Sequence, residues 1–269
     1  MQKMKIDILN LLSTPFLPNV FEDLLQYNNY SEKIIIQLFP SIDTQGFINN
    51  AMYINDMSLG PVEDIIEVNQ HRVFFEKNEF AYFNELIHIL DIFQYQQPQM
   101  LLILAGLQEA FNHLNLGGKG DKNKRKYTEN EFRNKKINFS LLNQDEFIYK
   151  KEFKEIFETN LVPDLYLGIA KFNDYLNFIW EHLKHLYAFP EIRKRSRGLY
   201  YYALSSSKYF AYPIKSDLEY CLQNEIDKND IEEIQLILQS NLFMYSIMIM
   251  HCTAMRVGLG YNQKLVVRG

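Results

Sequence analysis

One aspartate in the chain stands where a carboxylate could act as a general base. Asp164 follows Pro163 at the predicted start of a helix, within the segment Val162–Leu183. A carboxylate that is held beside water in a partly dry pocket has a pKa and an orientation that suit removal of a proton. The alternative role is structural, because an acidic residue in the first turn of a helix interacts favourably with the helix dipole. The sequence leaves both roles open for Asp164.

Two polar residues could bind the carboxylate group of a substrate. Gln97 stands before Pro98 and an apolar helical run, where its amide could either orient a carboxylate or cap a helix that begins there. Arg256 stands at the end of the last predicted helix, where a cation interacts favourably with the helix dipole. Its guanidinium is also a suitable partner for a carboxylate. We expect the helix-end role for Arg256 and leave both roles open for Gln97.

Aromatic side chains could enclose such a pocket. Phe16, Tyr95 and Tyr245 are the candidates, since each lies at a predicted contact between helices. Aromatic residues at helix contacts belong to the core more often than to a binding site. The sequence therefore gives these three residues a core role first and a pocket role second.

Histidine and cysteine residues give little support for metal or thiol chemistry. His182 and His185 lie three residues apart on one predicted helix, and no further ligand of fixed spacing joins them. Cys221 and Cys252 lie far apart and form no CxxC motif, which excludes a disulfide scaffold and favours a reducing, cytoplasmic compartment. We predict that these residues bind no metal.

The candidate base lies in an internal repeat. Leu17–Leu38 and Val162–Leu183 align without gaps, and both copies open with an apolar residue and a proline. Apolar residues then recur at helical spacing in both copies, and Asn19 of the first aligns with Asp164 of the second. We predict a duplicated helical unit, and the cleft between the two copies is the first place to expect a site.

The remaining pattern predicts an all-α protein, because no segment shows the sustained alternation of a β-strand. We expect two tandem related helical halves that form a pseudo-dimer with a pocket between them. The first half covers residues 1–116, a basic Gly/Lys-rich linker covers 117–138, and the second half covers 139–269. We interpret the linker as a solvated connection, since its GGKGDK sequence lacks the GxxxxGK[ST] pattern of a phosphate loop.

Proline sets several of the predicted helix boundaries. Pro40 and Pro61 are predicted to end helices, and Pro98 to separate two helical runs. Near the C-terminus the pattern predicts two further helices, at Asp230–Gln239 and Asn241–Gly258. These boundaries depend on local signals alone.

Composition limits the class of protein. The 269 residues are 47% hydrophobic, which supports a substantial core, and the net charge of −5 gives no reason to expect a nucleic-acid partner. The N-terminal apolar run is short and broken, and the apolar run near the C-terminus is too short to cross a bilayer. We predict a cytoplasmic protein, with a homodimer as a possible assembly.

Three segments resemble the group I 2-haloacid dehalogenase family, also described as halocarboxylic acid dehydrogenases of the DehI type. They are Phe93–Leu102, Val162–Leu183 and Leu242–Tyr245, and the similarity extends from about Phe16 to Leu259. A single copy of the repeat is also similar to the alkylhydroperoxidase-like (carboxymuconolactone decarboxylase) helical proteins. The CxxC that those proteins often contain is absent here.

The first resemblance implies an all-helical pseudo-dimer in which an aspartate activates water. The water attacks the α-carbon of a short 2-halo acid, displaces halide and inverts the centre without metal, cofactor or covalent ester. The resemblance places this aspartate at Asp164, although a gap-free alignment on Phe172 places it at Leu165, about 100° away around a helix. The implied substrate pocket comprises Phe16, Asn19, Gln97, Met100 and Tyr245.

The alternative is a catalytically silent or divergent protein of the same fold. Such a protein would bind a small apolar acid or a protein partner. The two alternatives differ at Asp164, because only the enzyme needs this carboxylate to reach a pocket.

Overall fold

The computed structural model describes residues 2–68, 70–76, 80–113, 115–126, 141–159 and 161–261. Within these ranges the chain forms helices and two isolated β-bridges, and no β-strand. The predicted all-α class is therefore confirmed.

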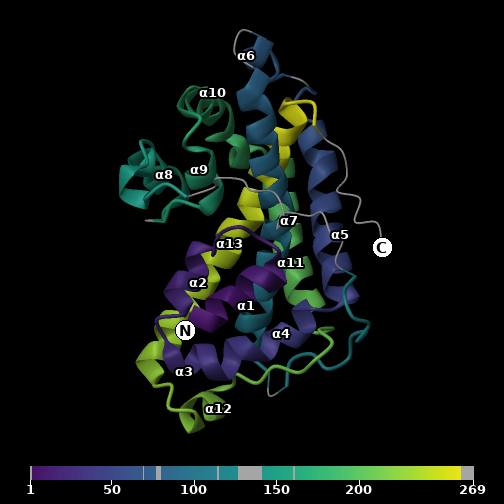
Figure 1. Ribbon diagram of the computed structural model, residues 1–269, viewed down its shortest axis with the longest axis vertical. Coiled ribbons are helices and arrows are strands. Elements are labelled where there is room, and N and C mark those ends of the chain that lie inside the picture. Colours follow the sequence, from purple (N-terminus) through teal and green to yellow (C-terminus); the bar gives the residue numbers. More distant parts are fainter. Residues whose placement is uncertain are drawn as a thin grey trace.

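Two long helices form the centre of the fold. Helices α7 (Phe80–Ala110) and α13 (Lys228–Gly258) have 31 residues each and pack against one another. Helices α5 (Gln45–Glu63) and α11 (Pro190–Ser207) pack against both, and the four run side by side along the long axis (Figure 1). By length and composition α13 could cross a membrane, but 67% of its most apolar window is buried in the protein. We therefore assign α13 to the core.

Shorter elements surround this central group. The shorter α-helices are α1 (Gln2–Leu12), α2 (Asn19–Leu24), α3 (Asn28–Tyr30), α4 (Ile36–Ile42), α6 (Val73–Glu76), α8 (Lys150–Phe157), α9 (Asp164–Ile169), α10 (Asn173–Leu183) and α12 (Leu218–Gln223). A π-helical turn (Ser31–Ile35) and two 3-10 turns (Gln144–Glu146 and Leu186–Ala188) complete them.

The two repeated segments begin with similar local structure. Helices α2 and α9 have six residues each, and Pro18 and Pro163 occupy their N-cap positions. Proline suits a helix start because the N–H that it lacks has no partner there. Helix α5 precedes α11 by the same 145 residues that separate Asn19 from Asp164, and α7 precedes α13 at nearly this offset. The order of elements therefore recurs along the chain.

The predictions that proline would end helices are wrong. Pro40, Pro61 and Pro98 lie inside α4, α5 and α7, and the two helices predicted near the C-terminus form the single helix α13. An internal proline removes one main-chain hydrogen bond and crowds the preceding turn. Burial of the apolar faces of these helices outweighs that local cost, since most of the residues around Pro98 are fully buried.

Most of the described residues of the basic linker, 117–126, are exposed, and Arg125 anchors this segment to the fold. Within residues 117–126, Arg125 is buried, and its guanidinium Nη1 donates to the carbonyl oxygen of Leu11 at 2.9 Å. The main-chain N–H of Arg125 donates to the carbonyl oxygen of Asp43 at 2.9 Å. These contacts hold the segment against α1 and α4. Residues 127–138 of the predicted linker lie outside the described residues.

Arg256 lies in the last turn of α13, as predicted, and its side chain is buried there. Its side chain is only 2% exposed, and Nη1 forms an ion pair with the carboxylate of Asp91 on α7. The guanidinium also lies over the ring of Tyr261, 4.9 Å from its centroid. In addition to its helix-end position, Arg256 thus joins the two central helices.

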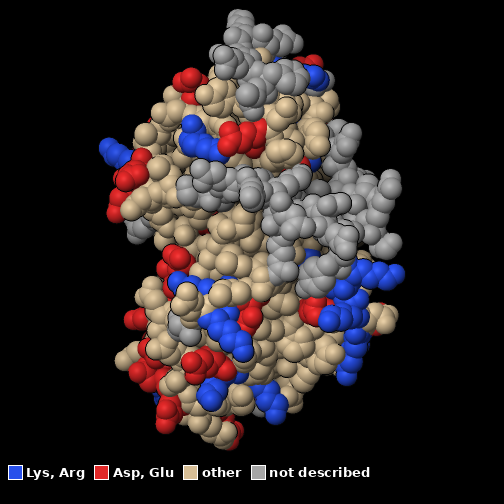
Figure 2. Space-filling view, viewed as in Figure 1, with Lys and Arg blue, Asp and Glu red and all other residues tan. Residues whose placement is uncertain are grey.

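Charged side chains of both signs are mixed on the surface. Figure 2 shows Lys and Arg next to Asp and Glu over the lower half of the face that it draws. Several of these residues form close pairs, such as Lys150 with Asp145 at 2.6 Å and Lys184 with Glu181 at 2.7 Å. The expectation that nucleic acid is not a partner stays a prediction.

Two helical glycines give a matched test of the packing. A Cβ added to Gly106 on α7 would overlap the ring of Phe210, whereas one added to Gly198 on α11 meets no described atom within 4 Å. Gly106→Ala should therefore lower the free energy of unfolding by about 1–3 kcal/mol. Gly198→Ala should raise it by about 0.5–1 kcal/mol, because alanine favours the helix. Urea unfolding of both variants checks this; equal effects would contradict the described packing.

Candidate active site

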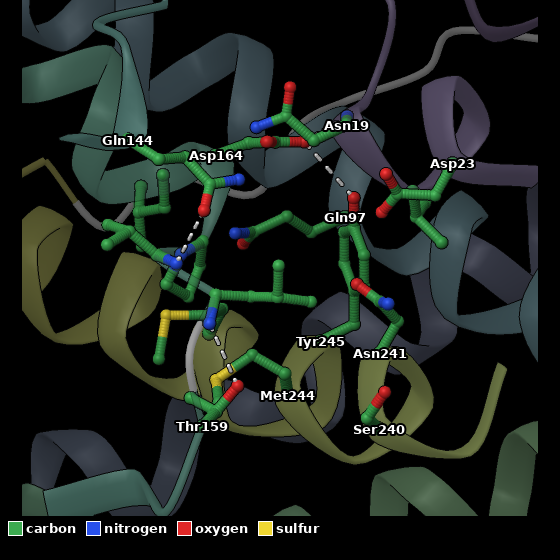
Figure 3. A pocket seen from close by; sticks show the side chains of 16 residues that line it. Asn19, Asp23, Gln97, Gln144, Thr159, Asp164, Ser240, Asn241, Met244 and Tyr245 are labelled. Atoms are coloured by element: carbon green, nitrogen blue, oxygen red, sulfur yellow. Dashed lines mark hydrogen bonds between the residues drawn. The ribbon is translucent and has the colours of Figure 1, made fainter. Parts of the chain in front are cut away.

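The starts of the two repeated helices meet. The main-chain N–H of Asn19, the first residue of α2, donates to Oδ2 of Asp164, the first residue of α9, at 3.2 Å. The residues that the sequence alignment pairs are therefore in direct contact (Figure 3). Asp164 has a partner from the other copy of the repeat, in addition to the dipole of its own helix.

A small pocket that opens to solvent lies at this contact. Residues of α2, α7, α9 and α13 line it, together with the segment that leads into α9. The lining residues are Asn19, Val20, Asp23, Gln97, Gln144, Thr159, Leu161, Val162, Pro163, Asp164, Leu165, Ser240, Asn241, Met244, Tyr245 and Met248.

The pocket changes the acidity of Asp164, which is only 7% exposed. Burial raises the pKa of this carboxyl to about 7, and the main-chain N–H of Asn19 and the hydroxyl of Tyr245 partly oppose that rise. The Tyr245 hydroxyl donates to Oδ2 at 3.4 Å. The negative charges of Asp23 and Glu22 raise the pKa further. A carboxyl with a pKa near 7 gives and takes protons readily at neutral pH, as a general base must.

Gln97 presents an unused hydrogen-bonding group to the pocket. It lies inside α7 and is 2% exposed, so the prediction that it might cap a helix is wrong. Its Oε1 has no hydrogen-bond partner among the described residues. Figure 3 shows the amide extending toward the middle of the pocket. A buried amide oxygen without a partner indicates a place for water or a ligand.

The structure brings four of the six predicted site residues together. Asn19, Gln97, Asp164 and Tyr245 all line the pocket. Phe16 and Met100 lie outside the lining; the ring of Phe16 packs against Phe93, with ring centroids 5.4 Å apart, and Met100 is fully buried. Asp164 and Leu165, the two positions that the alignments offer for the aspartate, both line the pocket, and Asp164 is the one that has a carboxylate.

Several polar residues of the lining are not among the predicted site residues. Asp23 lies four residues after Asn19 on α2, and Asn241 lies four residues before Tyr245 on α13. Residues four apart share one face of a helix, so this spacing could have revealed both. Gln144 lies in a short turn far from the repeat, and no local signal connects it with the site.

The histidines that could take part in catalysis or bind a metal, His251 and His182, do not line this pocket. His251 is buried, and the hydroxyl of Tyr166 lies 2.7 Å from its Nδ1. The ring of His182 stacks on that of His71, with centroids 5.6 Å apart. Among the described residues no three or more His, Cys, Asp or Glu side chains are placed to hold a metal ion.

Comparison with known proteins identifies the fold. No family model and no curated protein matches the chain. A solved structure of a D-2-haloacid dehalogenase mutant with D-2-CPA superposes with a TM-score of 0.86 at 16% identity, over 96% of this chain and 92% of that one. This chain has the D-2-haloacid dehalogenase fold.

Two further dehalogenase structures support this assignment. A solved structure of a D-2-haloacid dehalogenase with L-LA superposes with a TM-score of 0.81 at 16% identity. The superposition covers 94% of this chain and 90% of the dehalogenase chain. A mutant of this enzyme class has the same TM-score and identity and covers 94% of this chain and 89% of its own. The all-helical dehalogenase fold that the sequence resemblance implied is confirmed, whereas the pseudo-dimer and the reaction stay predictions.

Proposed function

We propose that the chain is a hydrolytic dehalogenase-like enzyme in which Asp164 activates a water molecule. The observation that supports this most is the position of its carboxylate, which is buried in a pocket at the contact between the two repeated helix starts. A pKa of about 7 suits proton removal from water at neutral pH. The fold shared with D-2-haloacid dehalogenases favours halide displacement over other hydrolytic reactions.

The proposed step follows from the hydrogen bonds of Asp164. Both of them end on Oδ2, so we assign proton removal to Oδ1. As the water gives its proton to Asp164, its oxygen bonds to C2 of the substrate, and the halide leaves with the electron pair of the broken carbon–halogen bond. The buried amide of Gln97 can orient the water or the substrate. Short 2-halo carboxylic acids and their uncharged derivatives are the substrates that we propose.

Halide release tests this proposal. The wild-type enzyme at micromolar concentration should release chloride from racemic 2-chloropropionate or 2-chloropropionamide at pH 8. Release of no halide from either compound, or from their bromo analogues, would contradict the proposed reaction. Binding without turnover would instead support the alternative of a catalytically silent protein with this fold.

The pH dependence gives a second prediction. The rate constant kcat/KM should rise with pH through a midpoint near 7, as Asp164 loses its proton. Tyr245→Phe removes a hydroxyl that stabilises the ionised carboxylate, so the midpoint should move upward. Tyr201→Phe changes a tyrosine that is 64% exposed and should leave the midpoint unchanged. A midpoint near 4 in the wild type, or no shift in Tyr245→Phe, would contradict the role of Asp164.

A further inference from the structure

We infer that the pocket prefers a short uncharged carboxamide, such as a 2-halo amide, to the corresponding free carboxylate, and that Asp23 sets this preference. The preference for a 2-halo amide as a substrate rests on the proposed function, whereas the preference in binding does not depend on it. Two independent features support it: the charges around the pocket and the hydrogen-bonding groups that its side chains leave for a ligand.

A second carboxylate lies in the pocket with Asp164. Asp23 lies one turn beyond Asn19 on α2 and lines the same pocket (Figure 3). Partial burial and the neighbouring charge of Glu22 raise the pKa of Asp23. The negative charges of Asp23 and Glu22 also raise the pKa of the Asp164 carboxyl, after the larger effect of burial.

No opposite charge balances these carboxylates in the described lining. The remaining polar lining residues are all uncharged; they are Asn19, Gln97, Gln144, Thr159, Ser240 and Asn241. Lys5 lies 3.9 Å from Glu22, but both side chains of that pair are about half exposed and Lys5 does not line the pocket. A carboxylate ligand would therefore meet two like charges in a partly dry site, where repulsion is stronger than in water.

The uncharged side chains leave acceptors as well as donors for a ligand, and only the acceptors distinguish an amide from a carboxylate. Gln97 is only 2% exposed, and its Oε1 has no hydrogen-bond partner among the described residues. Figure 3 shows its amide extending into the pocket. The hydroxyl of Ser240 donates to the carbonyl oxygen of Leu236 at 2.7 Å, so its lone pairs remain for a ligand. Asn241 Nδ2 donates to the carbonyl oxygen of Ile237 at 2.9 Å, which leaves its Oδ1 as the acceptor.

These acceptors match an amide better than an acid. A primary carboxamide supplies two N–H donors and a carbonyl acceptor, whereas an ionised carboxylate supplies acceptors alone. Gln144 can satisfy the carbonyl, because its Oε1 accepts from the N–H of Val162 at 3.4 Å and its Nε2 remains a donor. The reaction stays balanced: the 2-halo amide and water give the 2-hydroxy amide, halide and a proton, which Asp164 takes up.

Binding of the two product forms tests the preference without turnover. In calorimetric titrations at pH 8, the wild type should bind lactamide at least about tenfold more tightly than lactate, a ratio that one close like charge can produce. Asp23→Asn should reduce this ratio to about threefold or less, mainly by tighter binding of lactate. Glu32→Gln removes the same charge from an exposed residue of the π-helical turn and should leave the ratio unchanged.

The outcomes separate this inference from the proposed function. Lactate binding as tight as lactamide, binding of neither at 10 mM, or an unchanged ratio in Asp23→Asn would overturn the inference. Chloride release from 2-chloropropionate would still support the proposed function in those cases. Conversely, tighter binding of lactamide without any halide release would support the inference and contradict the proposed function.

Discussion

Asp164→Asn should lower the rate of halide release by about 10²–10⁴-fold, the usual contribution of a positioned general base. Asparagine has nearly the same shape as aspartate but cannot take a proton from water. Its side-chain oxygen can still accept from the N–H of Asn19 and the hydroxyl of Tyr245, so the pocket should keep its geometry. Initial rates of chloride release at pH 8 check the prediction. A variant that keeps more than half of the wild-type rate would exclude Asp164 as the base.

Stability measurements show whether the lower rate of Asp164→Asn reflects the loss of a general base or a damaged fold. The folded-state pKa of Asp164, about 7, lies above its ordinary value of 3.8. The stability that the protonated carboxyl contributes is therefore complete below pH 3.8 and is lost as the pH rises through 7. Asp164→Asn should match the wild type in urea unfolding near pH 4 and exceed it at pH 8. Lower stability than wild type at pH 8 would favour the helix-dipole role.

Asp91→Ala should lower the free energy of unfolding by about 3–5 kcal/mol, because it leaves the buried guanidinium of Arg256 without its partner. The pair joins α7 to α13 in the centre of the fold. Urea unfolding at pH 7 measures the effect. This is the largest loss of stability that we expect from a single side chain outside the pocket.

Two controls isolate the buried charge. Glu85→Ala breaks the Lys171–Glu85 pair, whose side chains are 37% and 44% exposed, and should change stability by at most about 1 kcal/mol. The double variant Asp91→Leu/Arg256→Met replaces both charges by apolar groups and should recover most of the loss. An effect of Asp91→Ala no larger than that of Glu85→Ala would contradict the central role of the pair.

The starts of the repeated helices could be predicted because their signals are local. Pro18 and Pro163 occupy N-cap positions, and proline fixes the backbone dihedral that a helix start needs. The constant offset between the copies then aligned Asn19 with Asp164. Their hydrogen bond joins segments 145 residues apart, so only the repeat could suggest it from the sequence.

The length of the central helices could not be predicted from local signals. Pro98 disfavours a continuous helix by itself, and the chain accepts it because α7 is buried along most of its length. Tertiary packing therefore decides the structure at this position. Local signals also could not predict the ion pair of Arg256, because its partner Asp91 lies 165 residues away.

The pocket was partly predictable for similar reasons. Helix periodicity connects Asp23 with Asn19, and Asn241 with Tyr245, once one member of each pair is assigned to the site. Gln144 comes from a turn with no periodic relation to either helix. Only the packing of that turn against the start of α9 brings it to the pocket.

A single turnover in ¹⁸O-labelled water tests the central claim most directly. With enzyme in excess over 2-chloropropionamide or 2-chloropropionate, direct attack by water places one ¹⁸O in the 2-hydroxy product. Mass spectrometry of the peptide that contains Asp164 should then find no label. Label in the Asp164 carboxylate and unlabelled product would show that the carboxylate attacks the substrate itself, which would contradict its role as a general base.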